Sequence, residues 1–286
     1  MAEIISGKIV SEQVKNRVKA EAEKLKEQGV NIGLAVVIVG NDPASTVYVN
    51  NKKKACAYVG INSRSYELPE DTTEEQLVEL VKELNADDTV NGILVQLPLP
   101  AQIDEDKIIR TISADKDVDG FHPESVGRLW IGEKGFLSCT PAGVIQLLKR
   151  SGIEIAGKEC VIIGRSNIVG KPMAALLLRE NGTVTVAHSR TKSLADVTRR
   201  ADILIVAIGK ERFITSDYVK KGAVVIDVGM HRDAENHLCG DVDFADVEPV
   251  ASAITPVPGG VGSVTTSVLI EHVVDAALLK AGLDIL

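Results

Sequence analysis

The amino-acid sequence predicts an α/β protein with two α/β domains. Short apolar runs rich in valine and isoleucine alternate with amphipathic segments of helical period, which indicates repeated β-α-β units. Aromatic residues make up only 3% of the chain, so the core must rest on aliphatic side chains that suit buried parallel strands. The length of 286 residues is sufficient for two domains that each bury a core.

The composition is that of a soluble globular protein. Hydrophobic residues make up 45% and charged residues 25%, and the net charge of −8 offers no general basic face for nucleic acid or an acidic membrane. No run approaches the roughly 20 apolar residues that span a bilayer, and the N-terminus lacks a signal-peptide pattern. The four cysteines are widely spaced, which argues against disulfides or a zinc site: Cys56, Cys139, Cys160 and Cys239. We therefore expect a cytosolic protein with no metal, nucleic-acid or membrane partner.

The first 120 residues alternate helical and extended segments. The expected elements are, in order, a helix ending near Gly29, a strand at 32–39, a helix at 44–59 that stops at Gly60, and a strand at 92–97. Between the last two, Thr72 and Glu75 predict a capping box that begins a helix with one apolar face.

After Cys139 the β-α-β pattern repeats with short connections. Strands are expected at 159–164, 183–188, 201–209, 223–228 and 251–255, with helices at 141–150, 173–181, 193–200 and 264–280. We assign residues 1–139 to a first domain, completed by the C-terminal helix 264–286, and residues 140–263 to a second. The return of the last helix to the first domain predicts a cleft between the two.

A glycine-containing loop from Gly164 to Gly170 follows one of these strands and precedes a helix. Glycines let the backbone approach a pyrophosphate, and the N–H groups of a helix start face the anion. The common GxGxxG pattern is not met, because Ser166 occupies the second glycine position, and an ordinary glycine turn is the alternative. The surrounding β-α-β units favour dinucleotide binding by a Rossmann-like parallel sheet.

The end of the next strand indicates NADP rather than NAD. An NAD site offers an acidic residue there to the ribose, whereas an arginine accommodates a 2′-phosphate. The sequence reads His188-Ser189-Arg190 with no acid, and Arg165 in the preceding loop supplies a second guanidinium. The alternative is that both arginines are solvated surface residues.

Tyr48 and Lys52 lie four residues apart on an expected helix and share a face. A Tyr-x-x-x-Lys pair carries catalysis in short-chain dehydrogenases, but there the nucleotide glycines precede the tyrosine, and here they follow it. The Lys52-Lys53-Lys54 run is also consistent with a solvated helix face.

Three further segments carry polar or glycine-rich patterns. Gln96 interrupts an apolar strand, so its amide must be paired, either within the protein or with a ligand. The acidic turn 115–120 lacks the downstream glutamate and spacing of a calcium-binding EF-hand loop. The segment 255–265 has prolines followed by glycines, which is typical of a connecting loop or of a wall for a cofactor.

Seven stretches together resemble the methylenetetrahydrofolate dehydrogenase/cyclohydrolase family, in the order of that family and over nearly the whole chain. They begin at Tyr48 (YVNNKKK), Val95 (VQLPLP), Asp115 (DKDVDGFHP), Cys139 (CTPAG), Gly164 (GRSNIVGKP), His188 (HSRT) and Thr255 (TPVPGGVG). The departures are Ser138 in place of proline, and Ser263-Val264 in place of Pro-Met.

The resemblance implies a role for particular residues. Lys52 would be the catalytic residue with Gln96 hydrogen-bonded to it, Tyr48 would stack on the folate ring, and Asp119 would bind the N–H donors of the pterin. Substrate binding would involve Tyr48, Lys52, Gln96, Leu97, Pro98, Asp119, Pro258 and Gly259. The NADP site would comprise Thr140, Gly164, Arg165, Ser166, Ile168, Val169, Ser189, Arg190, Gly262 and Thr265.

The activity that the resemblance implies has two steps. NADP-dependent oxidation of 5,10-methylenetetrahydrofolate gives the 5,10-methenyl compound, and hydrolysis then gives 10-formyltetrahydrofolate. Lys52 would transfer protons, which requires a lowered pKa. The resemblance also implies a homodimer with tetrahydrofolate derivatives as ligands, acting in one-carbon metabolism and purine biosynthesis. The alternatives are a dehydrogenase without hydrolase activity, an amino-acid or shikimate-type dehydrogenase, and a non-catalytic NADP-binding sensor or scaffold.

Overall fold

The computed structural model describes residues 1–40 and 43–285, with the side chains of 43–48 outside this description, and it divides into two compact units. Unit 1 comprises Met1–Ser11 and Thr140–Thr265, and unit 2 comprises Glu12–Cys139 and Thr266–Leu286. The domain ranges expected from the sequence place residues 1–11 in the first domain together with the residues of unit 2, whereas the structure places them in unit 1. They differ because the first strand pairs in parallel with a strand near the other end of the chain.

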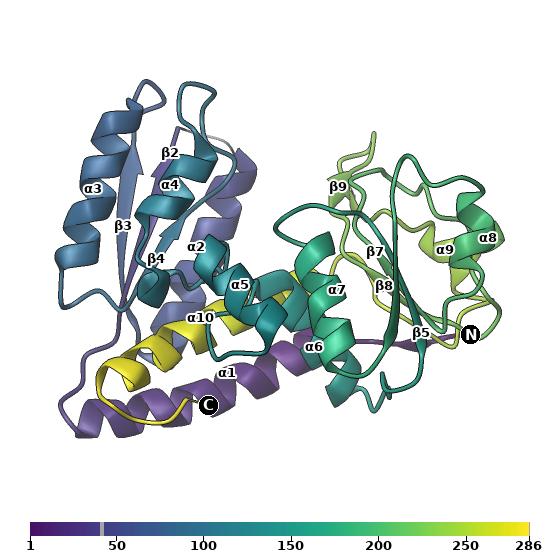
Figure 1. Ribbon diagram of the computed structural model, residues 1–286, viewed down its shortest axis with the longest axis horizontal. Coiled ribbons are helices and arrows are strands. Elements are labelled where there is room, and N and C mark those ends of the chain that lie inside the picture. Colours follow the sequence, from purple (N-terminus) through teal and green to yellow (C-terminus); the bar gives the residue numbers. More distant parts are fainter. Residues whose placement is uncertain (41–42, 286) are drawn as a thin grey trace. The chain divides into compact units, whose positions relative to one another are not determined.

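Unit 1 is built on a six-stranded parallel sheet of order β1-β11-β8-β7-β5-β6 (Figure 1). The strands are β1 (Glu3–Ile4), β5 (Glu159–Ile163), β6 (Thr183–Ala187), β7 (Ile203–Val206), β8 (Val224–Asp227) and β11 (Ala253–Ile254). A separate antiparallel pair is formed by β9 (His231–Arg232) and β10 (Leu238–Cys239). The predicted α/β class with a Rossmann-like parallel sheet is therefore confirmed.

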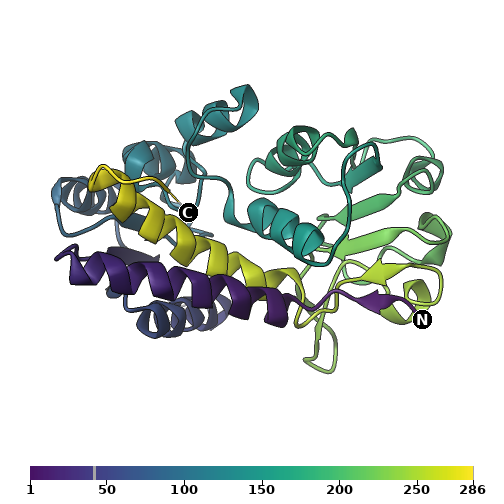
Figure 2. The same cartoon turned by 90° about the horizontal axis from the view of Figure 1, so that it is seen from below.

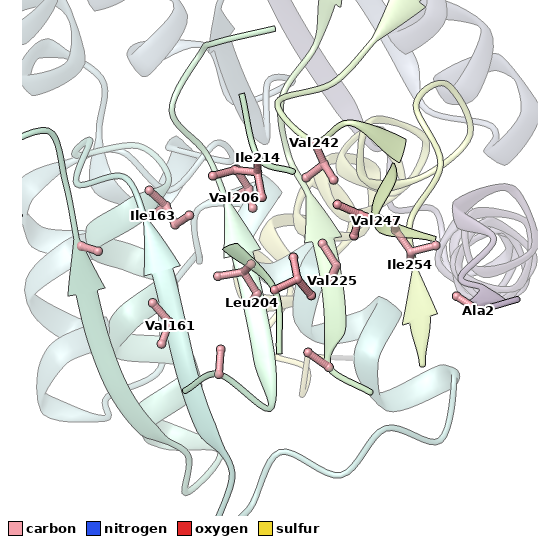
Figure 3. Packing of buried hydrophobic residues seen from close by; sticks show 14 residues of the cluster. Ala2, Val161, Ile163, Leu204, Val206, Ile214, Val225, Val242, Val247 and Ile254 are labelled. Atoms are coloured by element: carbon pink, nitrogen blue, oxygen red, sulfur yellow. The ribbon is translucent and has the colours of Figure 1, made fainter. Parts of the chain in front are cut away.

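Helices cover both faces of this sheet. The helices are α6 (Cys139–Arg150), α7 (Gly170–Arg179), α8 (Leu194–Thr198) and α9 (Phe244–Val247), with a 3-10 turn at Ser216–Tyr218. Alternate strand residues such as Val161, Leu204 and Val225 pack with Val247 of α9 in one buried cluster (Figure 3). The intervening residues, for example Ile162 and Ile205, are also fully buried. Burial of both strand faces explains the continuous apolar runs of the sequence.

Unit 2 contains a three-stranded parallel sheet of order β3-β2-β4 (Figure 1). The strands are β2 (Gly33–Val39), β3 (Asn62–Leu68) and β4 (Gly92–Val95), and the helices beside them are α2 (Pro43–Val59), α3 (Glu74–Ala86), α4 (Glu105–Thr111) and α5 (Pro123–Ile131), with a 3-10 turn at Ala114–Lys116. Val37 and Ile93 pack against Leu77 and Val81 of α3 and Ile108 of α4. This cluster forms one side of the core of unit 2.

Two long helices, α1 (Gly7–Glu27) and α10 (Val261–Lys280), run side by side (Figure 2). Within unit 2, Arg17 forms an ion pair with Glu271, and the valines at 14 and 18 are fully buried. The expectation that no segment reaches the length and apolarity of a membrane span is wrong for α10. That helix is 20 residues long and sufficiently apolar by composition, and 78% of its apolar window is buried within the protein, as in the core helix of a globular protein.

Several predicted elements differ locally from the structure. The capping box lies one residue later than expected, at Thr73 and Gln76. The Thr73 hydroxyl accepts from Gln76 N, and Thr73 N donates in return to Gln76 Oε1. The strand expected at 92–97 ends at Val95, so Gln96 follows the strand and does not interrupt it. The edge strand β3 had no expected counterpart, because its residues are mostly polar and lack the continuous apolar run of a fully buried strand.

Candidate active site

Lys52 and Gln96 are brought together at the carboxyl edge of the sheet of unit 2. Lys52 projects from α2, and its Nζ donates to Oε1 of Gln96 at 3.0 Å. Gln96 follows β4 directly; its backbone N–H donates to Val37 O, and its Nε2 donates to Leu97 O at 2.8 Å. Both polar ends of the amide are thus engaged, and Oε1 is turned to the ammonium group. The pairing expected from the resemblance is present, whereas its catalytic role is a proposal.

The acidic turn that follows the 3-10 turn at Ala114–Lys116 contains two aspartates in different environments, Asp117 and Asp119. Asp117 is buried, and its carboxylate accepts from His122 N at 2.7 Å, Ser125 Oγ at 2.8 Å and Phe121 N at 3.2 Å. Burial, with a smaller contribution from the nearby Asp119 charge, raises the pKa of Asp117 to about 6. Asp117 therefore builds the turn, and Asp119 is left to face the site.

Close backbone packing fixes the direction of Asp119. Asp117 forms a parallel bridge with Ile93 of β4, so the turn lies beside the strand that ends at Gln96. Gly120 has a φ of +71°, and a Cβ there would lie 2.3 Å from the carbonyl carbon of Leu137. Only glycine fits this combination of backbone conformation and contact. The segment that ends at Cys139 is thereby packed against the turn.

Asp119 lies among Lys52, Cys139 and His272. Burial raises the pKa of the Asp119 carboxyl, and the positive charge of Lys52 opposes that rise. The Nδ1 of His272 lies 2.9 Å from Val118 O, and because a carbonyl only accepts, Nδ1 carries the proton. Desolvation lowers the pKa of His272, so this ring is neutral. The carboxylate and the ammonium of Lys52 form a small polar site with opposite charges.

Three residues of this cluster were absent from the site expected from the sequence. Cys139 donates its thiol to Val118 O at 3.2 Å, and it lies 3.7 Å from Nδ1 of His272. The third is Asp117, described above. His272 is buried in α10, most of whose residues are apolar. A histidine within this apolar stretch was the only feature of the sequence that could have indicated it as a site residue.

The other predicted substrate residues have mixed positions. The side chain of Tyr48 lies outside the described residues. Leu97 is half-buried and Pro98 is exposed, directly after Gln96. Pro258 and Gly259 belong to unit 1, in the loop between β11 and α10. Lys53 forms an ion pair with Glu67 at 3.1 Å, and Lys54 is exposed.

The glycine loop after β5 has the close packing expected of a phosphate-binding turn. Gly164 has a φ of +127°, and a Cβ there would lie 2.1 Å from Ala207 O. A Cβ on Gly170 would lie 2.3 Å from Gly164 O, so both glycines are required by backbone contact. Ser166 Oγ accepts from Val169 N at 3.1 Å and Gly170 N at 3.3 Å. The Ser166 hydroxyl therefore holds the end of the loop directly before α7, and two N–H groups that the sequence left free for an anion are bonded to it.

Arg165 and Arg190 follow adjacent parallel strands at the same edge of the sheet. Ile163 of β5 pairs with Ala187 of β6, and the two arginines come two and three residues after these partners. Both arginines are exposed, as is Ser189, and no acidic residue lies between Ala187 and Arg190. The loop after β6 is fixed by His188, whose backbone N–H donates to Thr191 Oγ1 and whose Nδ1 accepts from Arg190 N. This edge suits a phosphate better than a pair of ribose hydroxyls.

The remaining predicted cofactor residues lie in two parts of unit 1. Thr140 of α6 and Thr265 of α10 place their hydroxyl oxygens 3.2 Å apart. Gly262 is exposed, and a Cβ there would lie 2.8 Å from Cε of Met230. Ile168 is 40% exposed and Val169 half-buried in the glycine loop. Their contact with a cofactor stays a prediction.

The parallel sheet with a glycine loop at its carboxyl edge defines unit 1 as the dinucleotide-binding part of an NAD(P)-dependent enzyme. Residues 138–281 match the model of the tetrahydrofolate dehydrogenase/cyclohydrolase NAD(P)-binding domain, and residues 5–119 match the catalytic domain of the same family. The chain belongs to the tetrahydrofolate dehydrogenase/cyclohydrolase family. The resemblance inferred from the seven sequence stretches is therefore confirmed.

Individual relatives cover the whole chain. The bifunctional protein FolD of Lachnoclostridium phytofermentans is 67% identical, over 97% of this chain and 98% of its own length. The crystal structure of the bifunctional FolD methylenetetrahydrofolate dehydrogenase/cyclohydrolase of Campylobacter jejuni has a TM-score of 0.96 and 48% identity, and covers 98% of this chain and all of its own. The FolD of Trypanosoma brucei, solved with NADP and an inhibitor, has a TM-score of 0.93 and 38% identity, with 98% of each chain covered.

Proposed function

We propose that this protein oxidises 5,10-methylenetetrahydrofolate to 5,10-methenyltetrahydrofolate with NADP and hydrolyses the product to 10-formyltetrahydrofolate. The observation that carries the proposal is the hydrogen bond between Lys52 and Gln96, with Asp119 among the charged neighbours of Lys52. The printed activities of the relatives from L. phytofermentans and C. jejuni, both bifunctional, support the same assignment.

The edge of the unit 1 sheet fits NADP. Gly164 and Gly170 leave room for the backbone to approach a pyrophosphate, and Arg165 and Arg190 offer guanidinium forks to a 2′-phosphate. When bound, NADP supplies a nicotinamide that takes up the hydride lost by the bridging carbon of the folate. Ser166 holds the loop in place through its bonds to Val169 N and Gly170 N.

Lys52 carries the proton transfers of the hydrolytic step. Water adds its oxygen to the methenyl carbon and loses both protons, one C–N bond breaks, one proton ends on the released nitrogen, and the other passes to solvent. The Nζ of Lys52 is held by Gln96 Oε1, which limits its rotation and keeps it available at one position. The same polar site also orients the substrate in the oxidation, because the bridging carbon is the reacting atom in both steps.

Asp119 binds the pterin end of the folate. A carboxylate can accept two adjacent N–H donors at once, and a pterin ring presents such a pair in its 2-amino group and the neighbouring ring N–H. Asp119 is available for this because the hydrogen bonds of the turn are taken by Asp117. The thiol of Cys139 and the neutral ring of His272 hold Val118 O, directly before Asp119.

The finer assignments follow from the family. We infer a homodimer, a cytosolic location, and a supply of 10-formyltetrahydrofolate for purine biosynthesis, with no nucleic-acid or membrane partner. The net charge of −8 supports the last of these, because a nucleic-acid binder needs a basic face. The catalytic folate domain and the NADP domain expected from the sequence correspond in this proposal to unit 2 and unit 1.

A paired assay of purified wild type and Lys52→Ala tests this function. It follows NADP-dependent methenyl formation and, separately, hydrolysis of supplied methenyltetrahydrofolate. We expect Lys52→Ala to reduce hydrolysis about 10²- to 10⁴-fold, the usual contribution of an acid–base group, with NADP affinity unchanged. Lys53→Ala is the matched control, because Lys53 pairs with Glu67 and not with Gln96. Wild type that binds NADP but performs neither reaction contradicts the proposal and favours a non-catalytic sensor; oxidation without hydrolysis favours the monofunctional dehydrogenase.

A further inference from the structure

A buried carboxylate in unit 1, Asp241, collects four donors that the proposed chemistry does not use. Its Oδ2 accepts from Ile208 N at 2.7 Å and Gly209 N at 3.1 Å, and its Oδ1 accepts from Lys210 N at 2.8 Å. The fourth donor is the ring of His231, whose Nε2 lies 2.7 Å from Oδ1. Asp241 is fully buried, and the His231 side chain is 22% exposed.

The three successive N–H groups belong to the loop after β7, next to the strand order reversal of the sheet. β5 is flanked by β6 on one side and β7 on the other, so the chain direction across the sheet reverses between β5 and β7. In open parallel sheets a ligand binds outside the carboxyl ends of the strands at this point. The loop after β7 meets the glycine loop there, since Gly164 leaves room for Ala207 O. Residues 207–210 therefore form the second wall of the dinucleotide site.

A second buried carboxylate fixes Asp241 itself. Asp227, at the end of β8, accepts from Asp241 N at 3.0 Å, Val242 N at 2.9 Å and Gly229 N at 2.9 Å, and its own N–H donates to Thr255 Oγ1. A Cβ on Gly240 would lie 1.9 Å from Asp227 Oδ2, which shows how tightly the backbone surrounds this group. Asp241 is thus anchored from the sheet on one side and holds the loop after β7 on the other. The only side-chain donor to Asp241 within the described residues is His231.

We propose that His231 is a positioning residue for cofactor binding: through Asp241 it holds the backbone of residues 208–210 in the conformation that receives the dinucleotide. The inference rests on the proposed function for the identity of the cofactor. His231 contributes a donor to an oxygen that also holds Lys210 N, so its loss leaves that carboxylate less fully bonded and the loop less fixed. The loop follows β7, on the other side of β5 from β6 and the Arg190 loop that follows it. His231 therefore affects the part of the cofactor that NAD and NADP share.

Calorimetric titration of the full chain with NADP and, separately, with NAD tests the proposal. We expect His231→Ala to weaken the affinity for both nucleotides by about five-fold and by the same factor, because one of four bonds to the carboxylate is lost. His231→Gln, which retains an N–H donor, restores most of the affinity. Asp241→Asn, which turns one acceptor oxygen into a donor facing backbone N–H groups, has a larger effect than His231→Ala.

His237→Ala is the matched control, because this exposed histidine lies in the turn between β9 and β10 and its ring lies near Asp233 and Glu235, not at Asp241. Cofactor-free hydrolysis of methenyltetrahydrofolate reports on the fold of each variant, and we expect it to stay within two-fold of wild type for His231→Ala. The proposal is overturned if His231→Ala binds both nucleotides within two-fold of wild type. It is also overturned if hydrolysis falls in parallel with affinity, or if only the NADP affinity changes. The nucleotide titrations measure binding directly and do not depend on the folate assignment, whereas the hydrolysis control does. Wild type that binds both nucleotides but does not hydrolyse methenyltetrahydrofolate therefore contradicts the proposed function and not the role of His231.

Discussion

The ammonium nitrogen of Lys52 lies 3.0 Å from the amide oxygen of Gln96, although 44 positions separate the two residues in the chain. The contact arises because α2 follows β2 and Gln96 follows β4, and these two adjacent parallel strands end at the same edge of the sheet. It places a charged donor against a neutral acceptor and leaves the Nζ group two further donors for substrate or water.

Removal of this acceptor tests how far Lys52 depends on it. Gln96→Leu has a similar volume and no polar atom, and a hydrogen bond to a charged group contributes about 1.5 to 3 kcal/mol, so we expect hydrolysis to fall about 10- to 100-fold. Measurement of kcat for supplied methenyltetrahydrofolate gives the effect. NADP affinity serves as the control, since Gln96 belongs to unit 2. A Leu variant within two-fold of wild type would contradict the positioning role of Gln96.

The arginines after β5 and β6 predict the cofactor preference. Arg165→Gln and Arg190→Gln each remove one charged fork, and we expect NADP affinity to fall about ten-fold while NAD affinity is unchanged, as for the loss of a charge-assisted bond. Isothermal titration with both nucleotides measures the ratio. Arg179→Gln, in the last turn of α7, is an exposed arginine of the same unit and is expected to leave the ratio as in wild type. Equal losses for NADP and NAD would argue against a 2′-phosphate contact.

Gly120 and Gly127 provide a matched pair for backbone packing beside Asp119. Gly120→Ala places a Cβ against the Leu137 carbonyl at a φ of +71°, and we expect a loss of at least about 3 kcal/mol from strain and overpacking. Gly127 lies on the exposed side of α5 with no heavy atom within 4 Å of an added Cβ, so Gly127→Ala is expected to gain about 0.5 to 1 kcal/mol. Urea unfolding measures both. Equal stabilities for the two variants would show that the turn at Asp119 is not held by this contact.

Asp117 predicts a pH dependence of stability with a definite sign. Its pKa in the folded protein is about 6, above the ordinary 3.8, so the folded state binds more protons than the unfolded state between these values. The stabilisation is fully present below about pH 4 and is lost as pH rises through 6, amounting to about 3 kcal/mol for the full shift.

Comparison with Asp117→Asn isolates this group from the other carboxylates. The variant cannot titrate at this position, so the stability of wild type relative to the variant is expected to be highest at pH 4 and to decline towards pH 7. Urea unfolding of both proteins at several pH values measures the difference. A difference that is constant or that rises with pH would mean that the buried carboxylate does not have a raised pKa.

Local patterns in the sequence carried much of this description. Apolar runs such as 32–39 and 159–164 predicted buried strands, because a parallel sheet covered on both faces requires continuous apolar residues. Glycines at 164 and 170 indicated a phosphate-binding turn, because that conformation demands them. The absence of an acid before Arg190 indicated NADP. The family then linked Lys52 to Gln96 across segments that spacing alone could not connect.

The tertiary structure decided what depends on pairing between distant segments. It joined Glu3–Ile4 to the sheet of unit 1 and gave Asp117 the hydrogen bonds of its turn, which leaves Asp119 to the site. It also bonded the Ser166 hydroxyl to Val169 N within the glycine loop. It also determined that the ring of His231 hydrogen-bonds to Asp241, and that the ring of His272 hydrogen-bonds to Val118 O. Periodicity and turn chemistry are set by neighbours along the chain, and so the sequence determined the elements and the α/β class. Which buried polar group receives which donor is set by strand order and close packing, and only the folded chain determines those.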